Sequence, residues 1–136
     1  MSNLKDIAII GMAGRFPGAA TVEQFWQNLL EGKETIHHFS DAELEPFEID
    51  FANLKNNPNF VKARGIIEDI DKWDAKFFGY TPIEAAHTDP QHRLWLETAW
   101  HALEDAGCNP HSHTGSIGVF AGSYINTYLI NNILKI

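Results

Sequence analysis

The chain is poor in cysteine, in long hydrophobic runs and in signals that direct a protein to a membrane. Its single cysteine, Cys108, excludes an intrachain disulfide framework and is typical of a reducing compartment. The longest apolar runs, such as residues 7–10, are far shorter than the roughly 20 residues that cross a bilayer. Residues 1–6 are followed by no signal-peptide core. We therefore expect a cytoplasmic protein with no membrane partner.

Clustered positive charge is also missing. The sequence has 18 acidic against 10 basic residues, which gives a formal net charge of -8, and it has no run of lysine or arginine. Proteins that bind nucleic acid neutralise its phosphates with clustered basic side chains. We therefore expect no DNA or RNA partner.

Large aromatic side chains, by contrast, are frequent. Aromatics make up 12% of the 136 residues, with four tryptophans and nine phenylalanines. A chain of this length fits one domain, which can bury a core without a disulfide or a metal. The aromatic surface would either fill that core or meet a partner or a missing part of a larger domain, and the sequence leaves both alternatives open.

The strongest local signal is a helix at 89–107. Asp89 is a good N-cap, Pro90 suits the first helical position, and Gly107 is a typical helix stop. Apolar residues recur between them at helical spacing: Leu96, Ala99, Trp100, Leu103 and Ala106. The pattern predicts an amphipathic helix that packs through this face.

Weaker signals predict further helices. An apolar face and a terminal glycine predict a helix at 21–31, and a capping box opens another at Thr81. A short helix is expected at 71–78. Apolar residues at helical spacing fill 125–136 without a C-cap, which suggests a cut through a larger domain.

Two short apolar runs predict the sheet. Residues 6–11 and 116–122 are rich in β-branched residues and end at glycine, so we expect two buried strands, parallel and adjacent. Residues 60–67 suggest a short bent strand or hairpin, and 33–59 a long loop excursion. Strand, helices and strand in this order predict an α/β fold over residues 1–136.

No residue of the chain stands out as a catalytic, cofactor-binding or metal-binding group. Glycines at Gly11, Gly14 and Gly18 follow the first run, but Pro17 occupies the place where a dinucleotide-binding helix should begin. Cys108 follows a helix C-terminus, where the dipole would disfavour a thiolate, so we interpret it as structural.

The possible metal ligands do not converge in the sequence. One Glu-x-x-His pair, Glu84 with His87, is present where di-iron bundles need two. Four further histidines lie in polar, turn-rich segments without the spacing of a metal site: His37, His38, His111 and His113. We therefore expect no metal and no directly bound cofactor.

Five segments, in the right order, resemble the ketosynthase domain of modular type I polyketide synthases and hybrid peptide-polyketide synthases. They are residues 6–18, 25–32, 73–86, 89–107 and 118–122. Gly14 stands where many relatives have cysteine, and His92 where many have glutamine. The resemblance implies the N-terminal portion of a thiolase-like fold, incomplete in this chain.

The resemblance also implies a function. Ketosynthases catalyse decarboxylative Claisen condensation of acyl and malonyl thioesters, carried on the phosphopantetheine of an acyl carrier protein, in polyketide or fatty-acid-type biosynthesis. They use a cysteine in a Thr-Ala-Cys-Ser-Ser type of motif and two histidines farther along, none of which this chain contains. We therefore expect the chain alone to be inactive, with the remainder of the ketosynthase domain as its partner and a homodimer in the intact domain. The alternative is a non-catalytic docking or complementing module with a ketosynthase-derived scaffold.

Overall fold

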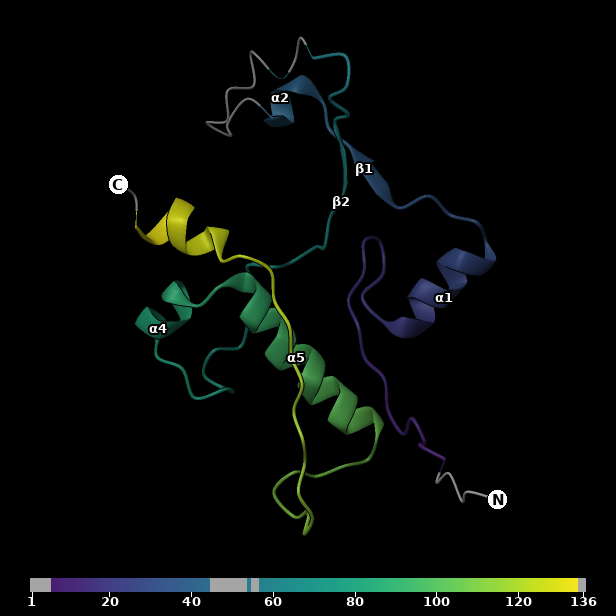
Figure 1. Cartoon of the computed structure of the whole chain (residues 1–136), viewed down its shortest axis with the longest axis vertical. Helices are drawn as coiled ribbons and strands as arrows, with labels where there is room; N and C mark the ends of the chain where they lie inside the picture. The colour runs from purple at the N-terminus through teal and green to yellow at the C-terminus, as the bar shows by residue number, and fades with distance from the viewer. Residues whose placement is uncertain (1–5, 45–53, 55–56, 135–136) are drawn as a thin grey trace. The chain divides into compact units, whose positions relative to one another are not determined.

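The computed structural model describes residues 6–44, 54 and 57–134 (Figure 1). The chain divides into two compact units. Unit 1 consists of residues 1–14 and 69–136, and unit 2 of residues 15–68. Within the described part, no helix combines the length and the apolar character needed to cross a membrane.

Unit 2 begins with a turn followed by helix α1 (Val22–Leu30). Thr21 caps the helix, because its hydroxyl oxygen accepts the N–H of Gln24 at 3.2 Å. Gly32 follows the helix with a positive φ of 62°, which a glycine adopts without strain. The helix predicted at 21–31 is confirmed.

The turn before α1 is closed by a pair of backbone hydrogen bonds. Phe16 and Ala19 exchange them at 2.8 and 3.0 Å, and Gly18 between them has a φ of 68°. The Phe16 ring stacks on Phe25 of α1, with ring centroids 4.2 Å apart. This contact attaches the turn to the apolar face of the helix.

A two-stranded antiparallel sheet follows in unit 2, formed by β1 (Ile36–His38) and β2 (Ala63–Gly65). Its register pairs Ile36 with Gly65 and His38 with Ala63. The strand expected at 60–67 is therefore confirmed in its central part. Residues 33–59, predicted as a long loop excursion, hold β1 and the short helix α2 (Asp41–Leu44), while 45–53 and 55–56 lie outside the described residues.

Unit 1 contains the helices α4 (Pro82–His87) and α5 (Pro90–Asp105). The capping box before α4 is formed, since Thr81 and Glu84 exchange side-chain to backbone hydrogen bonds in both directions. These contacts to Thr81 also lower the pKa of the Glu84 carboxyl.

Helix α5 begins and ends where the sequence predicts. Asp89 caps it at one end, and Gly107 follows the other end with a φ of 61°. The N–H of Gly107 donates to the carbonyl of Glu104, and that of Cys108 to Leu103, both at 2.9 Å. This pair of bonds is the Schellman arrangement that glycine favours.

The two strands predicted in unit 1 are not formed. Residues 6–11 and 116–122 belong to no helix or sheet, and residues Ile7 and Phe120 are 95% and 97% exposed. A strand needs a neighbour for its backbone hydrogen bonds, and a parallel sheet needs cover on both faces. The described residues of unit 1 supply neither. The expected parallel sheet was therefore wrong for this chain.

The short helix predicted at 71–78 was also wrong. The stretch has turns at residues 71 and 75–79 and no helix. Asp69 and Gly79, which flank it, have positive φ values of 56° and 77°. At the other end of unit 1 the helical spacing is confirmed by a short helix, although residues Leu129–Ile133 (η1) have the wider π-helical winding.

Candidate functional site

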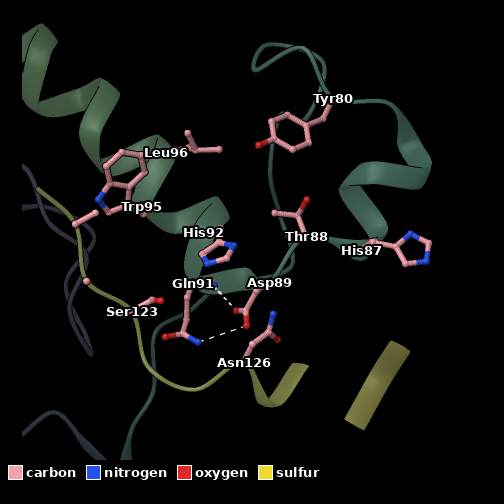
Figure 2. Close-up of a pocket in the computed structure, with 12 residues that line it drawn as sticks. Tyr80, His87, Thr88, Asp89, Gln91, His92, Trp95, Leu96, Ser123 and Asn126 are labelled. Atoms are coloured by element: carbon pink, nitrogen blue, oxygen red, sulfur yellow. Dashed lines mark hydrogen bonds between the residues drawn. The ribbon is translucent and has the colours of Figure 1, made fainter. Parts of the chain in front are cut away.

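A cavity of about 630 Å³ lies in unit 1 where the end of α4, the start of α5 and residues 121–126 meet (Figure 2). Its walls carry polar and aromatic side chains together. They come from Tyr80, His87, Thr88, Asp89, Gln91, His92, Trp95, Leu96, Ala121, Gly122, Ser123 and Asn126.

The bend between α4 and α5, which borders this cavity, is explained by the sequence between the two helices. Pro90 disfavours helical geometry at the residue before it, and Asp89 accordingly has φ -57° and ψ 134°. Thr88 is extended as well, with ψ 127°. Helix α4 therefore cannot continue into α5, and the chain bends at this junction.

Asp89 is one of the two buried residues in the described part of the chain, at 3% exposure. One carboxylate oxygen accepts the N–H of Gln91 at 2.8 Å, and the other accepts the Gln91 carboxamide at 3.4 Å. Figure 2 shows both bonds as dashed lines. Both oxygens are occupied by structural contacts, so Asp89 orients Gln91.

Gln91 connects this junction to residues 121–126, a segment that begins 16 residues after the end of α5. Its carboxamide oxygen accepts the backbone N–H of Tyr124 at 2.9 Å. Asp89, Gln91 and Tyr124 thus form a continuous chain of hydrogen bonds that holds Tyr124, within residues 121–126, against the start of α5.

A second link is made four residues farther along the chain, at Tyr128. The Tyr128 hydroxyl donates to the carbonyl of Ala86 at 2.8 Å. The Arg93 guanidinium donates to that hydroxyl at 3.4 Å and to the carbonyl of Thr88 at 2.9 Å. Its carbon also lies 5.6 Å from the centroid of the Tyr128 ring, within cation–π range. Both helices are therefore tied to residues 124–128.

The imidazoles at the cavity do not act as a pair. Figure 2 shows the rings of His87 and His92 well apart. His87 is engaged in its own helix, where Nδ1–H donates to the carbonyl of Ile83 at 2.7 Å. The described residues contain no group of three or more histidine, cysteine, aspartate or glutamate side chains placed to hold a metal ion. The hydrogen bonds at this cavity link backbone segments to one another.

The other histidines considered as metal ligands lie in both units. His37 lies 3.0 Å from a carboxylate oxygen of Glu43 in unit 2. Hydrogen bonds from the Ser40 hydroxyl and backbone, with a smaller contribution from His37, lower the Glu43 pKa to about 2. His111 lies in unit 1, beside a second cavity, and His113 lies near Gly115.

Cys108 lies just past α5 and is half-buried. It borders the second cavity, about 400 Å³, whose other walls include Trp100 and Pro110. In the described part of the chain the thiol has no hydrogen-bond partner. Activation of a cysteine needs a nearby positive group or base. His111 lines the same cavity as Cys108, so the structural role of Cys108 stays a prediction.

The early glycines have packing and turn roles. A Cβ on Gly11 would lie 2.6 Å from the carbonyl oxygen of Ala102 and 2.6 Å from the nitrogen of Ala106, so only glycine allows this approach to α5. The N–H of Met12 then donates to Asp105 at 2.8 Å. No helix begins between Gly11 and Gly18, as a dinucleotide site would require.

Sequence reasoning missed the residues that tie the junction together. No sequence pattern indicated roles for Gln91, Arg93 and Tyr128. Gln91 and Tyr128 contact backbone groups 33 and 42 residues away, and Arg93 contacts the backbone of Thr88, just before α5. No spacing rule in a single sequence reports such contacts.

Comparison with known proteins identifies the family. Residues 4–135 match the family described as "Beta-ketoacyl synthase, N-terminal domain". The chain is 48% identical over 129 residues to a phenolphthiocerol/phthiocerol polyketide synthase of Mycobacterium tuberculosis, a match that covers 95% of this chain and 9% of that protein. It is 38% identical to the polyketide synthase PksL of Bacillus subtilis, over 92% of this chain and 3% of that protein.

Solved structures agree. A bacillaene ketosynthase (ketosynthase twelve) of Bacillus amyloliquefaciens superposes with a TM-score of 0.62 at 40% identity, over 71% of this chain and 17% of that one. The module 6 ketosynthase of the bacillaene synthase of Bacillus subtilis gives a TM-score of 0.63 at 34% identity, over 77% and 17%. The chain belongs to the beta-ketoacyl synthase family and represents the N-terminal portion of its thiolase-like α/β fold. It spans about a sixth of the solved ketosynthase chains.

Proposed function

We propose that this chain supplies the N-terminal scaffold of a ketosynthase that condenses acyl and malonyl thioesters with loss of carbon dioxide. The observation that carries the proposal is the family match over residues 4–135, together with relatives that are polyketide synthases. The substrates would arrive on the phosphopantetheine of a carrier protein, and the chain itself would bind no cofactor.

In this proposal the chain positions other parts of the domain and supplies no reacting group. The nucleophilic cysteine and the two histidines come from the remainder of the domain, as the resemblance implies. The junction held by Gln91, Arg93 and Tyr128 would set the course of residues 121–128 for the elements that pack on it. A homodimer of the intact domain and a cytoplasmic location belong to the same proposal.

An acyl-loading assay tests the proposal. The chain is incubated with an acyl thioester of N-acetylcysteamine and its mass is measured, and we expect no acyl adduct. The same chain, mixed with a separately produced remainder of the ketosynthase domain, should allow that remainder to load acyl groups. A stoichiometric adduct on the chain alone would overturn the proposal, and loss of the adduct in Cys108→Ala would identify the thiol responsible.

A docking or complementing module is the second candidate function. Exposed apolar side chains on the extended segments 7–10 and 117–120 favour it, among them Ile9 at 80% and Val119 at 67% exposure. A segment that belongs to no sheet and carries apolar side chains can pair with the edge strand of a partner's sheet. Association with the remainder without any gain of acyl loading would support this candidate, whereas absence of association would exclude it.

A further inference from the structure

We draw no further inference here: the strongest candidate, the cavity where α4, the start of α5 and residues 121–126 meet, belongs to the site already described, and nothing in the described residues shows what fills it.

Discussion

Gln91 and Tyr124 lie 33 residues apart and are joined by one hydrogen bond, in which the Tyr124 N–H donates to the Gln91 carboxamide oxygen at 2.9 Å. The carboxamide is oriented in turn by Asp89. Because Tyr124 donates through its backbone, its side chain is not needed for the link. The contact therefore depends on the residue at position 91 and on the cap that precedes it.

Replacing Gln91 tests this link. Gln91→Ala removes the acceptor and leaves the Tyr124 N–H without its partner, which we expect to lower the free energy of unfolding by about 1 kcal/mol. Urea unfolding followed by tryptophan fluorescence measures the change, since Trp95 and Trp100 lie on α5. Gln27→Ala is the matched control, because Gln27 is an exposed residue of α1. Equal effects of the two variants would contradict a specific role for Gln91.

The cap of α5 gives a second prediction. Asp89→Ala should destabilise the protein by about 1 kcal/mol, because the N–H of Gln91 loses its acceptor. Asp89→Asn keeps a side-chain oxygen in the same place and should retain most of the stability. The helix signal in circular dichroism during urea unfolding distinguishes the two variants. If Asp89→Asn were as unstable as Asp89→Ala, the charge of the carboxylate would matter more than its hydrogen bonds.

These caps explain which part of the fold could be predicted from sequence. Asp89 and Pro90 act within the first turn of α5, and Gly107 acts within its last turn. The local sequence alone therefore determines where this helix begins and ends. Thr81 and Glu84 do the same for α4. The strands predicted at 6–11 and 116–122 are different, because an extended segment becomes a strand only through a partner distant in sequence. The same limit applies to Gln91 and Tyr128, whose contacts depend on tertiary structure.

The tight approach of Gly11 to α5 gives a third prediction. In Gly11→Ala the new Cβ would lie 2.6 Å from the carbonyl oxygen of Ala102 in α5 and 2.6 Å from the nitrogen of the C-cap Ala106, and these backbone atoms cannot move away as a flexible side chain could. We expect a loss of about 1–3 kcal/mol, as in other overpacked sites. Gly122→Ala is the control, because a Cβ there meets nothing within 4 Å. Similar unfolding midpoints for the two variants would show that residues 6–12 do not lie against α5 in solution.

The lowered pKa of Glu43 gives a prediction about acid. Its pKa falls from 4.5 to about 2 in the folded chain, mainly through hydrogen bonds from Ser40. A depressed carboxyl pKa contributes stability that is fully present above the unfolded value and is lost as the pH falls through the folded value. The contribution of Glu43 should therefore disappear between about pH 5 and pH 2. Ser40→Ala should raise the Glu43 pKa toward 4.5, as an NMR titration of the side-chain carboxyl would show. The control is Ser123→Ala, a substitution in unit 1, which should leave the Glu43 titration unchanged. If Ser40→Ala also left the Glu43 titration unchanged, the pKa shift could not be assigned to Ser40.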